Sequence, residues 1–298
     1  MSVAGRGAAV TWTGADGTDG RSTDARIRMM RWERAGRAGR PHAEQGLMNG
    51  RLSVEVEHTA AVAVLRPRGD LDLYSSHDLR GALLDCLADQ PDGIVLDLSE
   101  LAVVEDLALT VLTSIAQQSQ RWPGARIVLA GGTTEVLAAA DRMGLLRMMA
   151  TCPDVPGATK ELAGVVGVPR RRDRIAPDRD APGAARAAVA QFCADYGVGA
   201  GGDDAAAQLV ASELVTNAVV HAGTPIDLTL RLSRPQLHIA VRDGGDGRAR
   251  LAGIMDEAAE SGRGLVLVDA LSQAWGNFVP TSGKVVWAVV RVRLLSPA

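Results

Sequence analysis

The stretch AAAQLVASELVTNAVVHAG, from Ala205 to Gly223, decides the fold of the second half of this 298-residue chain. Its apolar residues recur three and four positions apart, which predicts an amphipathic helix with one buried stripe. The stripe consists of Leu209, Val210, Leu214, Val215, Ala218 and Val219. Glu213, Asn217 and His221 follow one another at intervals of four, so the same helix places them together on its other face.

This helix alone allows two interpretations of its polar face. In the first, Glu213 and Asn217 are simply the solvated side of a core helix. In the second, they form an acid–amide pair over a nucleotide: the Asn217 amide oxygen binds Mg²⁺, and the Glu213 carboxylate takes a proton from an attacking hydroxyl. Asn is a poor helix former, so its place in the middle of a helix requires a reason.

The composition sets limits on the class of protein. A length of 298 residues predicts two domains, and 47% hydrophobic with 22% charged residues is typical of a soluble globular chain. The net charge of −3 and the 3% aromatic content argue against a nucleic acid or a membrane surface as a partner. The three cysteines lie far apart, and no apolar run approaches the roughly 20 residues of a membrane span. We therefore expect a cytoplasmic protein.

Residues 1–47 show no sustained hydrophobic period, so we expect a disordered tail. A basic functional arm, or a true start at Met48, are the alternatives. From residue 48 to about 160, strand-like and helix-like segments alternate, which predicts a mostly parallel or mixed α/β sheet with helices packed on it. Arg68–Asp70 reads as a turn between elements, and Ser75 or Ser76 as a helix cap.

The segment LDLSELAVVEDLAL, from Leu96 to Leu109, resembles the STAS domain of anti-sigma factor antagonists. That family typically reads Asp-Leu-Ser, a few apolar residues, and then Asp-Ser-Ser-Gly-Leu at a helix start, where a partner kinase phosphorylates the second serine. Here Asp106 replaces the first serine, and the phosphoacceptor position is Leu107, which has no hydroxyl. The resemblance implies a degenerate regulatory domain that is not phosphorylated at this site. The alternative is that Asp106 only caps a helix.

Residues 161–174 contain a run of arginines near two prolines, and we interpret them as a solvated linker. Two glycine motifs follow the quoted helix. RDGGDG, from Arg242 to Gly247, ends a strand, and SGRGLVLVDAL, from Ser261 to Leu271, opens directly into a helix. Backbone N–H groups at such a helix start bind phosphate without a lysine. Only Lys160 and Lys284 occur in the whole chain, so no Walker motif is present.

These three elements occur in one order: Glu-x-x-x-Asn, Asp-x-Gly-x-Gly and Gly-Arg-Gly-Leu. Together they resemble the ATP-binding domain of the GHKL superfamily, and among its members the anti-sigma factor serine kinases most. The match covers roughly residues 175–296 and implies a Bergerat-type α/β sandwich. The family often has Thr where this chain has Val285. No helical hairpin with a phosphoacceptor histidine precedes the domain, and we interpret His221 as a packing or capping residue.

The resemblance implies roles for individual residues. Asp243 accepts the adenine amino proton, Asn217 binds Mg²⁺ between the phosphates, and Glu213 is the general base for a substrate serine. The remaining ATP contacts come from the two glycine motifs: Gly245, Gly247, Gly262, Arg263, Gly264 and Leu265. The expected cofactors are ATP and Mg²⁺. The expected partners are a sigma factor and a separate STAS-type antagonist with an intact serine, and the family likeness also implies a homodimer.

Three hypotheses of function remain open at this point. The first is a bacterial anti-sigma factor with protein-serine kinase activity, regulated by its own degenerate STAS domain. The second is a non-catalytic, nucleotide-binding scaffold for partner switching. The third is that the fused domain inhibits its neighbour by occupying the partner site.

Overall fold

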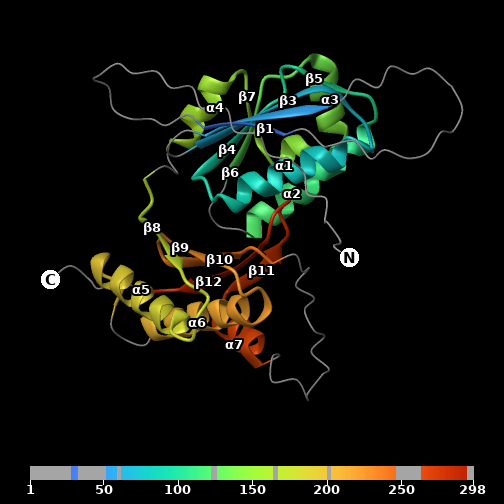
Figure 1. Ribbon diagram of the computed structural model, residues 1–298. Coiled ribbons are helices and arrows are strands. Elements are labelled where there is room, and N and C mark those ends of the chain that lie inside the picture. The colour runs from blue at the N-terminus through green and yellow to red at the C-terminus, as the bar shows by residue number, and fades with distance from the viewer. Residues whose placement is uncertain are drawn as a thin grey trace, which may run out of the picture. The chain divides into compact units, whose positions relative to one another are not determined.

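The computed structural model describes residues 28–32, 52–58, 62–121, 126–163, 167–199, 203–245 and 263–293, and the following account is confined to them. Contacts along the chain divide it into two compact units, with the main division between residues 166 and 167 (Figure 1). Each unit has its own sheet and its own hydrophobic core, so each is described by itself.

The first unit is built on a seven-stranded mixed sheet. Its strands are β1 (Arg28–Trp32), β2 (Ser53–His58), β3 (Val62–Leu71), β4 (Gly93–Asp97), β5 (Leu101–Val103), β6 (Arg126–Ala130) and β7 (Ala150–Cys152). They follow the order β1-β2-β3-β4-β6-β7, and β5 pairs with β3. The pairs within β1-β2-β3 are antiparallel and the others are parallel. Apolar runs in β4 and β6 explain the parallel core, because such strands are buried on both faces.

Helices pack on this sheet and connect its parallel strands (Figure 1). They are α1 (Ser76–Ala88), the 3-10 helix η1 (Asp106–Leu109), α2 (Thr110–Arg121), α3 (Thr134–Arg142), the 3-10 helix η2 (Leu145–Arg147) and α4 (Val155–Leu162). Local capping explains several boundaries. Thr133 accepts a hydrogen bond from the Val136 N–H at the start of α3, and Asp154 accepts one from the Gly157 N–H at the start of α4.

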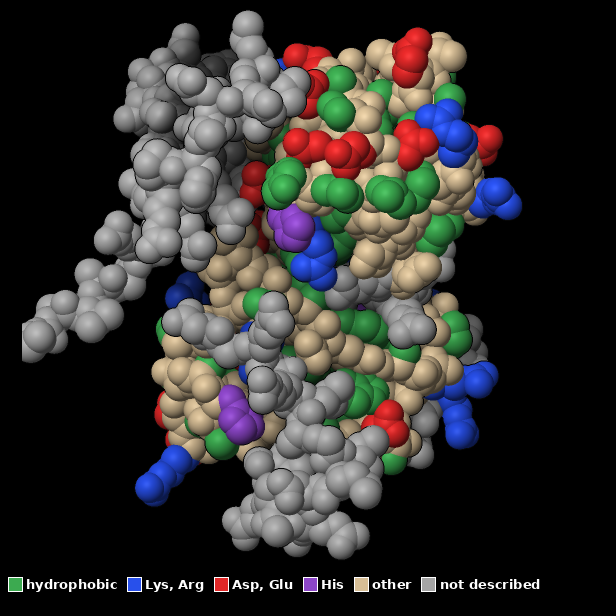
Figure 2. Space-filling view, turned by 90° about the vertical axis from the view of Figure 1, so that its right-hand side faces the viewer, with side chains coloured by type: hydrophobic (Ala, Val, Ile, Leu, Met, Phe, Trp, Pro, Cys, Tyr) green, Lys and Arg blue, Asp and Glu red, His purple; other side chains and the backbone are tan. Residues whose placement is uncertain are grey.

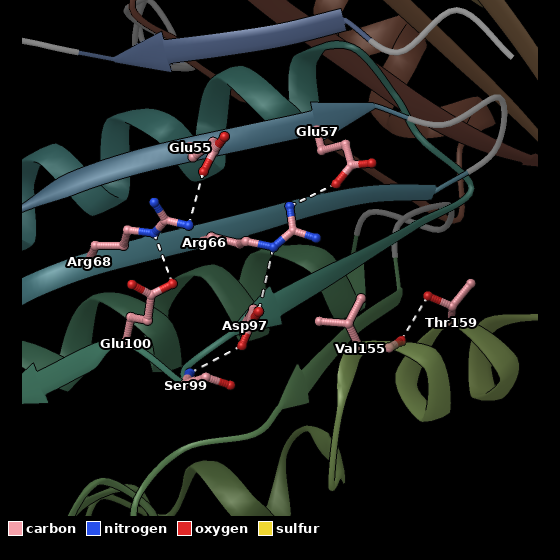
Figure 3. Close-up of polar contacts among 9 residues, drawn as sticks. All are labelled: Glu55, Glu57, Arg66, Arg68, Asp97, Ser99, Glu100, Val155 and Thr159. Atoms are coloured by element: carbon pink, nitrogen blue, oxygen red, sulfur yellow. Dashed lines mark hydrogen bonds and ion pairs between the residues drawn. The ribbon is translucent and has the colours of Figure 1, made fainter.

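Charged side chains of neighbouring strands form a cross-strand ladder on the sheet of the first unit (Figure 3). Arg66 on β3 bonds Glu57 on β2 at 2.7 Å and lies 3.6 Å from Asp97 on β4. Arg68 bridges Glu55 and Glu100 in the same way. Arg66 and Arg68 alternate along β3 with buried residues and follow Val62 and Val64, which pack under α4. The ladder therefore covers the part of this sheet face that lies beyond those apolar residues.

Two local expectations for the first unit are wrong. Arg68–Asp70 is part of β3 and not a turn: Gly69 pairs with Leu101 and has a φ of +102°, which glycine adopts without steric cost. Arg28–Trp32 forms strand β1 against β2, which departs from the expected disordered tail for these five residues. The other residues of the range 1–47 lie outside the described residues.

The second unit is a two-layer sandwich of one antiparallel sheet and three helices (Figure 1). Its strands are β8 (Arg170–Ile175), β9 (Ile226–Ser233), β10 (Gln236–Asp243), β11 (Ala274–Phe278) and β12 (Lys284–Arg291), in the order β11-β12-β10-β9-β8. Its helices are α5 (Ala181–Asp195), α6 (Asp203–His221) and α7 (Arg263–Leu271). Alternate residues of β9, β10 and β12 point into the core beneath these helices, among them Leu230, Ile239 and Ala288.

The expected linker, residues 161–174, is largely structured instead. Helix α4 continues to Leu162, and Arg170–Ile175 is the edge strand β8, antiparallel to β9. Of its six residues only Ile175 is buried, and Arg171, on the same face of the strand as Ile175, bonds Asp173 at 2.7 Å. The arginine run carries no local strand pattern, because the strand that pairs with it lies more than 50 residues further along the chain.

Candidate functional site

Helix α6 carries the polar pair that the sequence singles out. Val210, Leu214, Val215 and Ala218 are buried, whereas Glu213 and Asn217 are half-buried on the other face. The sequence pattern predicts that Leu209 belongs to the buried stripe, but this side chain is 38% exposed, so that prediction is wrong. His221, on the same side as the pair, is exposed.

The start of α7 approaches this pair closely. A Cβ atom added to Gly264 would lie 2.6 Å from Glu213 Oε2 and 3.9 Å from Asn217 Oδ1. Only glycine therefore fits beside the Glu213 carboxylate as it stands. The amino-terminal end of a helix attracts negative charge, so a carboxylate or a phosphate is stabilised here. Leu265 is half-buried at the same helix end.

A second group of site residues lies at the carboxyl end of β10. The Asp243 side chain is 1% exposed, and its Oδ1 accepts a hydrogen bond from the Gly245 N–H at 3.0 Å. The Gly244 N–H donates to Thr224 Oγ1 at 2.7 Å, which fixes the turn. Within the part of the chain that the structure describes, Asp243 Oδ2 makes no hydrogen bond, although Lys284 Nζ lies 3.4 Å away. It is a buried acceptor that remains available to a ligand.

Two glycines hold this turn against its neighbours. A Cβ on Gly245 would lie 3.0 Å from the Cβ of Ala222, just after α6. Gly283 has a φ of +80°, and a Cβ there would overlap the carbonyl oxygen of Asp243. The turn after β10, the end of α6 and the start of β12 are therefore packed together by backbone contact.

Helix α6 joins the two groups of site residues. Glu213 and Asn217 lie at one group, and Ala222 touches the other. The nine steps from Glu213 to Ala222 rise about 13 Å along a helix axis, a distance that a nucleoside triphosphate can span. The structure thus brings Glu213, Asn217 and Gly264 together, and separately Asp243 and Gly245. Gly247 and Gly262 lie outside the described residues, as does the side chain of Arg263.

Two site residues were missed from the sequence. The sequence pattern assigns Lys284 no role in the site, although the alternation of β12 could have placed it on the same sheet face as Asp243. Thr224 carried no motif at all. In the described ranges, no group of three or more His, Cys, Asp or Glu side chains is arranged to hold a metal. A single amide ligand such as Asn217 suits Mg²⁺, because this ion is usually bound through one or two protein groups together with substrate phosphates.

In the first unit, Asp106 and Leu107 begin η1. Both oxygens of the Asp106 carboxylate accept from Arg142 of α3, at 2.7 and 3.0 Å, and this hydrogen bonding lowers the pKa of Asp106. The N-cap of η1 is Glu105, so the helix-cap interpretation of Asp106 is not supported. Leu107 is 62% exposed.

Other large apolar side chains are exposed at the same end of this sheet, where the Val104 N–H bonds the Leu71 carbonyl. Val104 is 62% exposed, and Leu73 and Tyr74, just after β3, are 46% and 89% exposed. We call Leu73, Tyr74, Val104 and Leu107 the apolar patch. Figure 2 views the side of the molecule that carries α3 and β5, and shows hydrophobic side chains in a row there, with acidic ones nearby. Exposed apolar groups that gather in this way are typical of protein-binding surfaces.

Comparison with protein families identifies both units. Residues 53–158 match the STAS domain, and residues 175–289 match the histidine kinase-like ATPase domain. The chain therefore contains a STAS domain followed by a histidine kinase-like ATPase domain. The first implies binding of protein partners, and the second implies binding of ATP. No curated protein matches the chain significantly.

Solved structures match parts of the chain. An anti-sigma factor antagonist from Mycobacterium paratuberculosis is 22% identical over 37% of this chain and 93% of its own, with a TM-score of 0.33. The unphosphorylated anti-sigma factor antagonist SpoIIAA is 16% identical over 38% and 99%, with a TM-score of 0.33. The histidine kinase domain of a blue-light activated kinase from Erythrobacter litoralis is 18% identical over 72% and 95%, with a TM-score of 0.26. Among the helices that the structure describes, none is long and apolar enough to cross a membrane.

Proposed function

We propose that this protein is a bacterial, cytoplasmic, ATP-binding anti-sigma factor with protein-serine kinase activity. Its substrate is a serine of a separate STAS-type antagonist, and the partner that it sequesters is a sigma factor. The observation that carries the proposal is the arrangement along α6. A carboxylate and an amide lie beside the glycine start of α7, and a buried, available carboxylate oxygen lies near the other end of the helix.

The reaction follows from this arrangement. Asp243 binds the base, and the amino end of α7 binds the phosphates. The substrate serine oxygen attacks the γ-phosphorus, the bond from that phosphorus to the β,γ-bridging oxygen breaks, and ADP leaves. Glu213 accepts the proton of the serine hydroxyl as the new P–O bond forms. Mg²⁺, held by Asn217 and the phosphates, would supply charge neutralisation.

The STAS domain of the chain serves as a regulatory module in this proposal. Leu107 stands where the family carries its phosphoacceptor serine, so the domain is not a substrate at that position. The Asp106–Arg142 pair ties the segment to α3. The apolar patch offers a surface for a protein partner, which supports a role in partner binding.

The second function is a non-catalytic nucleotide-binding scaffold for partner switching. Val285, where the family often has Thr, does not decide between the two functions, because it alternates along β12 with Lys284 and lies on the opposite face of the sheet from Asp243. A scaffold requires Asp243 and the glycines but does not require Glu213 as a base.

The kinase proposal is tested with Glu213→Gln, which keeps the shape of the side chain and removes the base. The substrates are purified STAS proteins that retain the serine, and γ-labelled ATP reports the transfer. We expect transfer to fall by about 10²–10⁴-fold, the usual contribution of a general base, while Mg-ATP binding persists. Glu161→Gln, at an exposed residue of α4 in the first unit, is the matched control and leaves the rate unchanged.

Each of the remaining outcomes is informative. Transfer by Glu213→Gln at the wild-type rate would remove Glu213 from the catalytic role. Saturable ATP binding without transfer to any STAS serine would favour the scaffold. Failure of the wild-type protein to bind ATP, with Asp243→Asn as the control, would refute both functions.

A further inference from the structure

Lys284 and Asp243 form a buried ion pair in the proposed base site. They are directly paired residues of β12 and β10, so their side chains share one face of the sheet. The alternation of each strand places them on the helix-covered face, in register with core residues such as Val241 and Val286. Their side chains are only 8% and 1% exposed.

An ion pair that is removed from water loses much of its hydration, so burial alone does not explain why it is kept. The geometry is also loose for a purely structural pair. Lys284 Nζ lies 3.4 Å from Asp243 Oδ2, which forms no hydrogen bond within the described part of the chain. Asp243 Oδ1, in contrast, already accepts from the Gly245 N–H at 3.0 Å. An acceptor that makes no hydrogen bond therefore lies side by side with a donor that carries three protons.

A donor beside an acceptor matches the edge of a purine base. Adenine presents its amino donor next to the N1 acceptor, and guanine presents its O6 acceptor next to the N1–H donor. A carboxylate alone accepts a hydrogen bond from the adenine amino group, whereas it is repelled by the lone pairs of guanine O6. A lysine beside it can donate to adenine N1 or, equally, to guanine O6, while the carboxylate accepts from the neighbouring N–H.

We infer that Lys284 and Asp243 together read the base, and that the pair binds guanine nucleotides as well as adenine nucleotides. This inference rests on the proposed nucleotide site. Lys284 is thereby a specificity-determining residue: it widens the choice of base that Asp243 alone would restrict to adenine.

The first experiment measures equilibrium binding of Mg-ATP and Mg-GTP to the full chain. We expect the two dissociation constants of the wild type to differ by less than about thirtyfold, far below the 10⁴–10⁵-fold rejection that a dedicated hydrogen-bonding site achieves. Lys284→Met and Lys284→Thr are expected to raise the GTP-to-ATP ratio of dissociation constants at least about tenfold. Lys160→Met, which removes the other lysine of the chain, leaves the ratio unchanged.

The second experiment needs no variant, because removal of Lys284 leaves Asp243 unpaired and can prevent folding. In 1-deaza-ATP a C–H group replaces N1. If Lys284 donates to N1, this analogue binds the wild type at least about tenfold more weakly than ATP, as expected for loss of a charged hydrogen bond. Lys284→Arg, which keeps a cationic donor, should preserve the wild-type GTP-to-ATP ratio.

The outcomes separate this inference from the proposed function. A wild-type protein that binds ATP, rejects GTP by more than about thirtyfold and binds 1-deaza-ATP as tightly as ATP would overturn the role of Lys284 and leave the ATP site intact. A wild-type protein that binds neither nucleotide would overturn both.

Discussion

At the start of α7, the missing side chain of Gly264 leaves room for the Glu213 carboxylate. The site depends on this absence, because a Cβ at Gly264 would approach Glu213 Oε2 to 2.6 Å. The atom that would have to move, Glu213 Oε2, is at the far end of a flexible side chain. An added Cβ would therefore displace the carboxylate more than it would destabilise the fold.

We predict that Gly264→Ala slows phosphoryl transfer at least about tenfold, since small misplacements of catalytic groups cost this much or more. The free energy of unfolding should change by less than about 1 kcal/mol, because Ala also favours the helix by a comparable amount. Labelled transfer and denaturant unfolding measure the two effects. Gly183→Ala in α5 is the matched control, since the nearest atom to its added Cβ is 3.8 Å away. Equal transfer rates for both variants would contradict the close-approach argument.

At the scale of single elements, β8 protects the edge of the ATPase sheet. It covers one side of β9 along six residue pairs, from Arg170 to Ile175. The match to the ATPase family begins only at residue 175, so a fragment designed from that match would lose this strand. An unpaired β9 exposes a row of backbone N–H and C=O groups and becomes a template for aggregation.

We predict that a fragment of residues 176–298 is less stable than one of residues 167–298 and self-associates at high concentration. Thermal unfolding and light scattering of the two fragments provide the comparison. Adding Arg170–Ile175 back restores the edge strand and should restore the monomer in the same buffer. Equal stability and equal scattering would show that β8 contributes little to the sheet.

At the scale of the molecule, the two units have separate cores and separate sheets. A ligand stabilises the state that it binds, by about 2.7 kcal/mol at a hundred times its dissociation constant. Because the residues of the proposed nucleotide site belong to the second unit, this stabilisation should act on that unit alone.

We predict that saturating Mg-ATP slows hydrogen exchange in the second unit of the full chain, most of all in α6 and at the end of β10. Amides of β3, β4 and β6 should exchange at an unchanged rate. Peptide-level mass spectrometry resolves the two sets, and Asp243→Asn removes the effect. Equal slowing in β4 and α6 would mean that the two units unfold as one.

The sequence alone was sufficient for features that depend on neighbours along the chain. The period of α6, the alternation of β2 and the glycine start of α7 are local patterns, and they predict both the elements and the residue types of the site. The segment from Leu96 to Leu109 indicated the first domain family and the order of three motifs the second, as the comparisons confirm.

Tertiary structure alone decided the features that depend on distant partners. β8 is a strand because β9 pairs with it, and Gly69 lies in a strand because Leu101 lies opposite. Lys284 and Asp243 are 41 positions apart in the sequence and lie side by side only because of the register between β10 and β12. Strand pairing and the burial of charge are set by residues far away along the chain, so no local pattern carries them.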